Sequence, residues 1–142
     1  MKILQKTSAL LVWWLLAPVL LVAADERPVV PAAASVYVRY QYRSVGGAWA
    51  SSGTTLKGAV SESMMLNQLS RRHPGKEVRV LSAKVGGKSR RVSVHYQLRK
   101  GEGAWSSGST TLQDALTESM ARNQLSARHP GMEIRILSMT PQ

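Results

Sequence analysis

The amino-acid sequence predicts an α+β fold: two tandem β-α-β units, joined by a hairpin into a ferredoxin-like split βαβ plan. Three observations predict it. The chain matches itself without a gap at a shift of 56 residues, both copies begin and end with runs in which apolar and polar residues alternate, and a pattern with helical spacing lies between those runs. A length of 142 residues fits one domain or two very small ones.

The internal repeat is the strongest signal in the chain. Repeat 1, residues 36–84, and repeat 2, residues 92–140, are identical at 28 of 49 positions. Shared strings include Gly-Ala-Trp, Asn-Gln-Leu-Ser and Arg-His-Pro-Gly, in the same order in both copies. Two copies are too few for a solenoid, so a small globular unit is expected instead.

The chain before the repeats is expected to direct export. Residues 1–24 combine two early lysines, an apolar run broken only by Pro18, and small residues just before Asp25, which is the pattern of a cleaved secretory signal peptide. A retained membrane anchor is the alternative, although the run is short for a span. Either outcome places the repeats outside the cytoplasm, in a periplasm or secreted. Residues 25–35 are rich in Pro and Ala and predict an extended lead-in.

Strands are expected at both ends of each repeat. Residues 37–43 and 92–99 alternate and are rich in aromatic and β-branched side chains, and the closing strands are expected at 77–84 and 133–139. A Gly-containing turn follows each opening strand, and the stretch around the tryptophan after it allows one extra short strand per copy. Between the repeats, the Gly-Gly pair within 85–91 predicts a hairpin.

A helix is expected in the middle of each repeat. Thr55 and Thr111 are candidate N-caps, and His-Pro-Gly ends the helical pattern after Arg72 and Arg128, because Pro cannot continue a helix and Gly can turn the chain. In each helix, one row of residues at helical spacing, called the stripe, should face the core. The Asn side chain in each stripe is expected to form hydrogen bonds with loop backbone. The stripe comprises Leu56, Ala59, Val60, Ser63, Met64 and Asn67, with Leu112, Ala115, Leu116, Ser119, Met120 and Asn123 as counterparts.

Strand alternation assigns an apolar and a polar side to the predicted sheet. The apolar side, expected under the helices, comprises Val38, Tyr40, Tyr42, Val78 and Val80, with Val94, Tyr96, Leu98, Ile134 and Ile136 as counterparts. The polar side is expected to form one basic face that binds an anion, because guanidinium groups suit phosphate, sulfate and carboxylate. An ordinary solvated sheet face is the alternative. The candidate binding side chains are Arg39, Gln41, Arg43, Arg79, His95, Gln97, Arg99 and Arg135.

Two further features suggest contacts with other molecules. Trp49 and Trp105 follow a Gly turn in both copies and are candidates for stacking on a sugar or base, with packing at the edge of the core as the alternative. In the first predicted helix, Met65, Leu66 and Leu69 fall outside the core stripe. These three residues form a candidate interface for a homodimer or another protein partner.

Metal binding and catalysis have weaker signals. Copper is the metal best suited to imidazole and thioether ligands, and the candidate ligands are His73 and His129 with Met64 and Met120. The alternative is that each His lies at the C-terminal end of its helix because a positive side chain is favourable there. No close carboxylate pair recurs in both copies, and no nucleophile has an evident base. We therefore expect no enzymatic activity, no metal site and no cofactor.

Composition narrows the class of function. The absence of Cys excludes disulfides, thiolate metal sites and a Cys nucleophile. The chain carries 19 basic and 8 acidic residues, a formal charge of +11, which favours an anionic partner. The tandem layout resembles that of the sporulation-related repeat domains of bacterial envelopes, which are also paired βαβ modules and bind glycan strands. Each half here is longer by an insertion that carries the tryptophan, and the likeness is one of architecture that gives no residue a role.

Taken together, the sequence predicts an exported, non-enzymatic binding protein. Its expected partner is an anionic polymer or another envelope component: a polysaccharide, a phosphate polymer or a nucleic-acid backbone. No transmembrane segment is expected after removal of the signal peptide. The alternative is a structural module that self-associates through its first helix, and the third possibility is a metal carrier or envelope enzyme.

Overall fold

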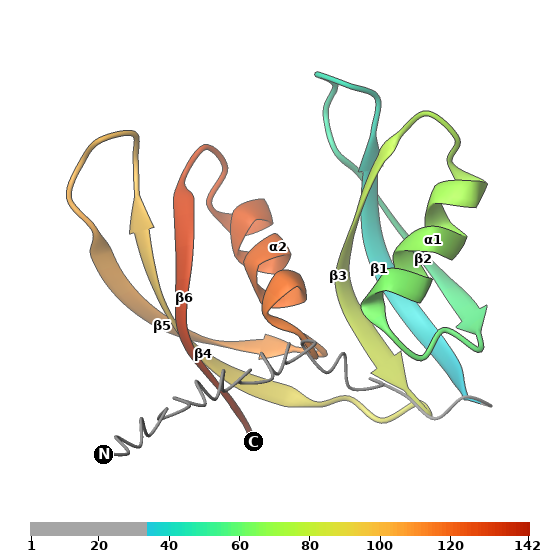
Figure 1. Ribbon diagram of the computed structural model, residues 1–142. Coiled ribbons are helices and arrows are strands. Elements are labelled where there is room, and N and C mark those ends of the chain that lie inside the picture. The colour runs from blue at the N-terminus through green and yellow to red at the C-terminus, as the bar shows by residue number, and fades with distance from the viewer. Residues whose placement is uncertain (1–33) are drawn as a thin grey trace, which may run out of the picture.

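The computed structural model describes residues 34–142, and within them the predicted α+β class is confirmed. The predicted signal peptide, 1–24, and nearly all of the lead-in, 25–35, lie outside the described residues. Figure 1 shows two small sheets, each with its own helix, standing side by side. Neither helix of the described chain is long and apolar enough to cross a bilayer.

Each repeat folds as a two-stranded hairpin, a helix and a returning strand. Repeat 1 contains β1 (Ser35–Arg43), β2 (Ala50–Lys57), α1 (Glu62–Arg72) and β3 (Glu77–Val85). Repeat 2 contains β4 (Arg91–Arg99), β5 (Ser106–Gln113), α2 (Glu118–Arg128) and β6 (Glu133–Pro141). The strand orders are β2-β1-β3 and β5-β4-β6, with all neighbours antiparallel. The first strand of each repeat is therefore the central strand of its sheet.

The two repeats do not share one sheet, so the predicted ferredoxin-like plan is replaced by two separate sheets. The expected Gly-Gly turn does form: the Lys88 N–H donates to the Val85 carbonyl over 3.2 Å, and Gly86 and Gly87 adopt φ of +57° and +72°. Past an isolated bridge between Val85 and Lys88, the strands on either side separate. The physical reason is that β4 already pairs with β5 and β6 and has no edge left for β3.

The stretch after each tryptophan is a full strand, and both helices begin later than predicted. Thr55 and Thr111, the predicted N-caps, lie inside β2 and β5, because consecutive threonines favour an extended, paired backbone. The actual N-caps are Ser61 and Thr117, whose hydroxyl oxygens accept the backbone N–H three residues further on. The predicted helix ends are confirmed, since α1 and α2 stop at the residue before His-Pro-Gly.

Burial of the strand residues follows the predicted alternation. Val38, Tyr40 and Val80 are buried beneath α1, and Val94 and Tyr96 occupy the matching places in repeat 2. In β1 and β4 the intervening side chains point to the opposite, polar side of the sheet, whereas residues 80–83 of β3 are all buried. Each sheet therefore has one face in the core and one face that carries the charged residues.

The core face of α1 differs from the predicted stripe. Met65 and Leu69 are fully buried, whereas Met64 is 41% exposed and Asn67 is exposed. The predicted helical count began at Leu56, which lies in β2, whereas the true helix runs from Glu62 to Arg72.

The second helix, α2, contacts two sheets at once, its own sheet and the outer edge of β3 (Figure 1). The side-chain amide of Asn123 donates to the Val80 carbonyl over 2.8 Å, and that of Gln124 donates to the Leu81 carbonyl over 2.7 Å. Asn123 thus has a backbone partner, as expected, but in a strand rather than a loop. An edge strand presents unpaired backbone groups, and α2 satisfies those of β3.

The loop before α2 completes this contact. The Ala83 N–H of β3 donates to the Asp114 carbonyl over 2.9 Å. Asp114 has a φ of +55°, and its carboxylate accepts the Arg90 N–H over 2.7 Å and the Ser89 hydroxyl. The inter-repeat connection, the β5–α2 loop and the edge of β3 are therefore held together by hydrogen bonds.

Equivalent positions in the two repeats differ in burial. The reason is that, within residues 34–142, a helix covers the outer edge of β3 and none covers that of β6. Met120 of α2 is fully buried, whereas its counterpart Met64 of α1 is 41% exposed. Leu81 of β3 is 9% exposed, whereas its counterpart Leu137 of β6 is 53% exposed. The duplicated sequence thus supplies matched pairs of residues in different environments.

We predict that Met120→Ala and Met64→Ala have very different effects on stability. Met120→Ala leaves a cavity where α2 meets the core and should lower the free energy of unfolding by about 2–5 kcal/mol. Met64→Ala removes a side chain that faces solvent and should change it by less than about 0.5 kcal/mol. Urea unfolding at low protein concentration measures both, and equal losses would contradict the described packing of α2.

Candidate functional site

The residues predicted to form one basic face lie on two sheets. The sheet of repeat 1 carries Arg39, Gln41, Arg43 and Arg79 on its polar side, and the sheet of repeat 2 carries His95, Gln97, Arg99 and Arg135. The predicted single face is therefore wrong, because β3 and β4 belong to different sheets. Arg39, His95 and Arg135 are exposed, and the other five side chains are half-buried.

In repeat 1, two arginines lie against one tryptophan. The guanidinium carbon of Arg43 is 4.3 Å from the centroid of the Trp49 ring, and that of Arg79 is 4.2 Å from it. Arg43 lies on β1, Arg79 on β3, and Trp49 just before β2, so all three strands position the group. Such cation–π contacts hold each guanidinium at a defined place. Together with Gln41 and Glu77, these residues are called cluster 1.

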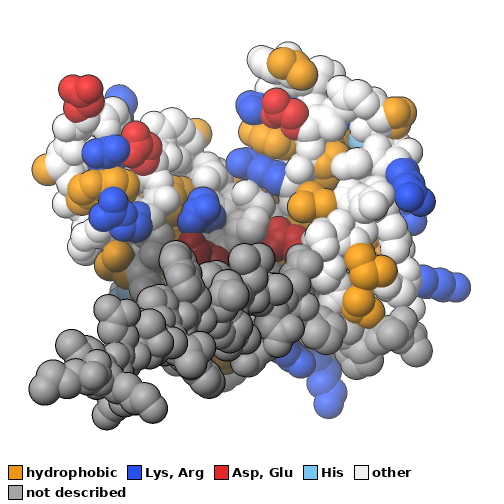
Figure 2. Space-filling view, in the orientation of Figure 1, with side chains coloured by type: hydrophobic (Ala, Val, Ile, Leu, Met, Phe, Trp, Pro, Cys, Tyr) orange, Lys and Arg blue, Asp and Glu red, His pale blue; other side chains and the backbone are white. Residues whose placement is uncertain are grey.

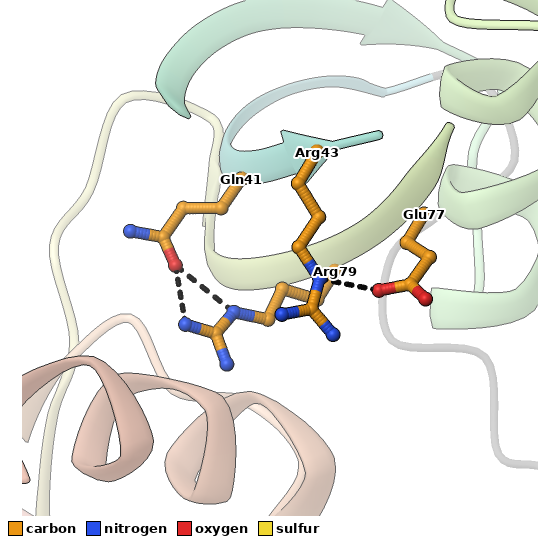
Figure 3. Close-up of polar contacts among 4 residues, drawn as sticks. All are labelled: Gln41, Arg43, Glu77 and Arg79. Atoms are coloured by element: carbon orange, nitrogen blue, oxygen red, sulfur yellow. Dashed lines mark hydrogen bonds and ion pairs between the residues drawn. The ribbon is translucent and has the colours of Figure 1, made fainter. Parts of the chain in front are cut away.

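Hydrogen bonds fix the two guanidinium groups of cluster 1 (Figure 3). Arg79 donates from Nε and from one terminal nitrogen to the Gln41 side-chain oxygen, over 2.9 and 2.6 Å. Gln41 in turn donates to the Ser51 hydroxyl over 3.0 Å. Arg43 forms an ion pair with Glu77 through its Nε. Both arginines retain further N–H donors, because a guanidinium carries five.

Cluster 1 is unbalanced in charge. Burial lowers the pKa of the Arg79 guanidinium below its ordinary value, and the nearby positive charge of Arg43 lowers it further. Arginine keeps its proton despite such a shift. Glu77 is the carboxylate that contacts the pair among the described residues, so two positive charges face one negative charge. An incoming anion would relieve the repulsion between the guanidinium groups.

Repeat 2 reproduces the arrangement. The guanidinium carbons of Arg99 and Arg135 lie 4.6 and 4.7 Å from the centroid of the Trp105 ring. Arg99 forms an ion pair with Glu133, and Gln97 donates to a serine hydroxyl over 3.3 Å, as Gln41 does in repeat 1. These five residues are called cluster 2. The two cation–π contacts, the ion pair and the Gln–Ser hydrogen bond therefore occur in both repeats, whereas the hydrogen bonds from arginine to glutamine are found in cluster 1.

The surroundings of cluster 1 include the second repeat. A cavity of about 280 Å³ lies between Trp49 and Arg79 on one wall and the end of α2, with His129, on the other. A second cavity, of about 360 Å³, lies between Arg39 of β1 and Arg128 of α2. Figure 2 shows a hollow between the two lobes, with basic side chains on both walls. Cluster 1 thus opens into a basic groove between the repeats.

The contact between arginines and tryptophan was not predicted, although a signal for it exists. Tyr42 pairs with Ala50 in the β1–β2 ladder, and one more step in that register brings Arg43 opposite Trp49. The prediction treated the second strand as short and optional, so it supplied no register for the tryptophan. Sequence reasoning found the charged residues and the aromatic residues separately.

The histidines are engaged by tyrosines of the core. His73 Nε2 lies 2.9 Å from the Tyr40 hydroxyl, and the His73 ring stacks on Tyr42 with centroids 4.2 Å apart. The His129 ring lies 6.1 Å from that of Tyr96. Residues 34–142 contain no group of three or more His, Cys, Asp or Glu side chains placed to hold a metal. Each histidine is also the C-cap of its helix.

The residues predicted to form an interface on the first helix are not the ones that the helix exposes. Met65 and Leu69 are fully buried beneath α1, and Leu66 packs against the core with part of its surface exposed. The helix runs from Glu62 to Arg72, and Met65 and Leu69 lie on its buried face. The side chains that α1 does expose include Met64 and Asn67.

Comparison with known proteins finds no relative. No family model matches the chain, and no curated protein or solved structure matches it. The comparisons therefore give no support to the resemblance to sporulation-related repeat domains. The residues of clusters 1 and 2 have to be interpreted from their own geometry.

We predict that cluster 1 attracts small anions to Trp49. In a chain without residues 1–24 and with Trp105→Phe, Trp49 is the single tryptophan. Iodide should quench its fluorescence more strongly than caesium, because two guanidinium groups raise the local concentration of anions. Adding Arg43→Gln and Arg79→Gln should remove most of that preference. Equal quenching by the two ions before these substitutions would contradict a net positive field at the cluster.

Proposed function

We propose that this protein is an exported, non-enzymatic binding module that holds an anionic polymer through clusters 1 and 2. The observation that carries the proposal is that each repeat places two guanidinium groups on one tryptophan ring, with one carboxylate in contact. Guanidinium groups bind phosphate, sulfate and carboxylate with paired, charge-assisted hydrogen bonds. The tryptophan then serves to hold the cations rather than to stack on a sugar or base.

The rigidity of each cluster supports binding rather than simple solubility. A mobile surface arginine loses conformational entropy when it binds an anion. In cluster 1 that freedom is already restricted by Trp49, by the Gln41 amide and by Glu77. The residual positive charge is therefore held at a defined position before any ligand arrives.

The duplication supports a polymer rather than a single small anion. Two similar sites on one chain can engage neighbouring groups of a repeating polyanion, and the second contact is then intramolecular. The groove beside cluster 1 is an open hollow between the lobes rather than an enclosed pocket (Figure 2). An extended chain with repeated negative groups fits that shape.

Export remains part of the proposal through residues 1–24, which lie outside the described structure. A positive start, an apolar run and a small-residue cleavage site support delivery to a periplasm or to the outside of the cell. The polymers available there include acidic polysaccharides, phosphate polymers and released nucleic acid. All three carry the repeated anionic group that the clusters would recognise.

The test is a titration with long-chain polyphosphate, sulfated polysaccharide and single-stranded DNA, followed through tryptophan fluorescence. We expect saturable binding that weakens as salt is raised, because salt screens the charges. Replacing Arg43, Arg79, Arg99 and Arg135 by Gln should weaken binding at least tenfold, about 1.4 kcal/mol. The polymer that retains affinity at near-physiological salt identifies the ligand class.

A matched control separates the clusters from overall charge. Lys57→Gln with Lys88→Gln removes two positive charges at exposed sites outside the clusters. This variant should bind nearly as tightly as the wild type, whereas Arg43→Gln with Arg79→Gln, which has the same net charge, should not. If both variants lose affinity equally, the clusters are not binding sites and the basic charge acts only in a nonspecific way.

We also predict that Glu77→Gln strengthens polyanion binding by a few-fold. Removing the carboxylate frees the Arg43 guanidinium and raises the net charge of cluster 1. Stability should change by less than about 1 kcal/mol, because the ion pair is partly exposed. The same titration and a urea unfolding curve check both statements. Weaker binding by the variant would mean that Glu77 orients Arg43 for the ligand.

A further inference from the structure

The two surfaces that form the contact between α2 and β3 each have an equivalent in the other repeat, and these equivalents do not contact each other within the described chain. Within one chain, the helix of repeat 2 closes the edge of the returning strand of repeat 1. Because the repeats match at a constant shift of 56 residues, α1 carries the same kind of helix surface, and β6 has the same kind of strand edge. Neither has its counterpart within residues 34–142.

The helix side of the contact is preserved in α1. Asn67 and Gln68 stand where Asn123 and Gln124 stand in α2, and Met64 stands where the buried Met120 stands. Gln68 already donates to the Lys57 carbonyl over 3.2 Å, just as Gln124 donates to the Gln113 carbonyl over 3.0 Å. The helix surface therefore has the chemistry and the local orientation of the one that closes β3.

The strand side is preserved in β6. The register of β6 against β4 repeats that of β3 against β1, including the shift that leaves one leucine unpaired: Leu81 in β3 and Leu137 in β6. Leu81 is 9% exposed beneath α2, whereas Leu137 is 53% exposed. The Val80 and Leu81 carbonyls that α2 occupies correspond to those of Ile136 and Leu137. An open edge of this kind is a template for association.

Charge is distributed differently at the two contacts. In the intramolecular contact, the strand side carries Arg39 and Lys84. The helix side carries Arg128 beside Gln113 and Ala127, and the loop before α2 carries Asp114. In the unused contact the strand side has His95 and Thr140, and the helix side has the basic residues Lys57 and Arg71. At these positions of the unused contact, Lys and Arg lie on the helix side alone, so the strand side opposes no lysine or arginine to them.

We propose that α1 of one chain docks on the β6 edge of a second copy of the same chain. In this contact, Asn67 and Gln68 donate to the Ile136 and Leu137 carbonyls, and Met64 covers Leu137. The inference goes beyond polyanion binding and does not depend on it, since it rests on the packing between repeats. It replaces the predicted interface on the first helix with a surface that is exposed.

The contact joins two different surfaces, so it is heterologous. Each chain has one α1 and one β6, and docking at one leaves the other free. Such contacts close into a ring only if the rotation between neighbours allows it, and otherwise they grow into a filament. We therefore expect head-to-tail oligomers whose size rises with concentration. A symmetric contact of α1 with α1 would stop at a dimer.

The test measures mass against concentration by sedimentation for protein purified from cells that express the full 142-residue chain. Met64→Glu places a charge on the helix surface, and Leu137→Glu places one on the strand edge. Both side chains are exposed, so the fold should survive, which circular dichroism checks. Each variant alone should be monomeric. Val45→Glu, at an 84% exposed position outside both surfaces, should associate like the wild type.

Mixing the two variants is the decisive step. Met64→Glu retains an intact β6 edge and Leu137→Glu retains an intact α1, so their mixture should form a dimer of twice the monomer mass and no larger species. Three outcomes would overturn the proposal: a wild type that stays monomeric at all concentrations, a Leu137→Glu variant that still associates, or a mixture that remains monomeric. A monomer whose β6 amides are nevertheless protected from hydrogen exchange would mean that another segment occupies the edge.

Discussion

The closure of the β3 edge by α2 is the interaction on which the rest of the structure depends. Each repeat is a three-stranded sheet with one helix, which is a small core by itself. The two cores become one hydrophobic cluster because α2 packs on both sheets. Two side-chain amides and one backbone carbonyl satisfy the strand edge, each worth about 1 kcal/mol net but costly to remove. The duplication therefore builds one folded body from two marginal units.

The same contact sets the surroundings of the candidate binding site. By standing against the edge of β3, α2 forms the second wall of the groove into which cluster 1 opens. Arg79 lines this groove, and burial followed by the nearby charge of Arg43 lowers the pKa of its guanidinium. Cluster 2 has the same Arg–Trp geometry on the other sheet. Two copies of one motif thus differ in environment, and cluster 1 combines the arginines of one repeat with the helix end of the other.

Local patterns predicted the faces of the strands well, because alternation is a property of the backbone: Val38 and Tyr40 are buried, and Arg39 and Gln41 are not. Which strands pair along their edges could not be predicted from this alternation. Whether β3 pairs with β4 depends on which edges β4 has free, and that is decided by residues far away in the sequence. The predicted start of the first helix was wrong for a related reason. Thr55 has the chemistry of an N-cap, but it is held in the ladder between β1 and β2. The arginines and the tryptophan were each visible in the sequence, but their contact required the register of β2.

Amide hydrogen exchange at two equivalent positions tests whether α2 closes the edge of β3. The Ala83 N–H donates to the loop before α2, and the matching register places the Met139 N–H at the outer edge of β6. In dilute protein, we expect the Ala83 amide to be strongly protected and the Met139 amide to exchange rapidly, with protection of Met139 appearing as the protein concentration rises. Rapid exchange of Ala83 would show that α2 does not close β3. Equal protection of both amides in dilute monomer would show that the two edges are not different.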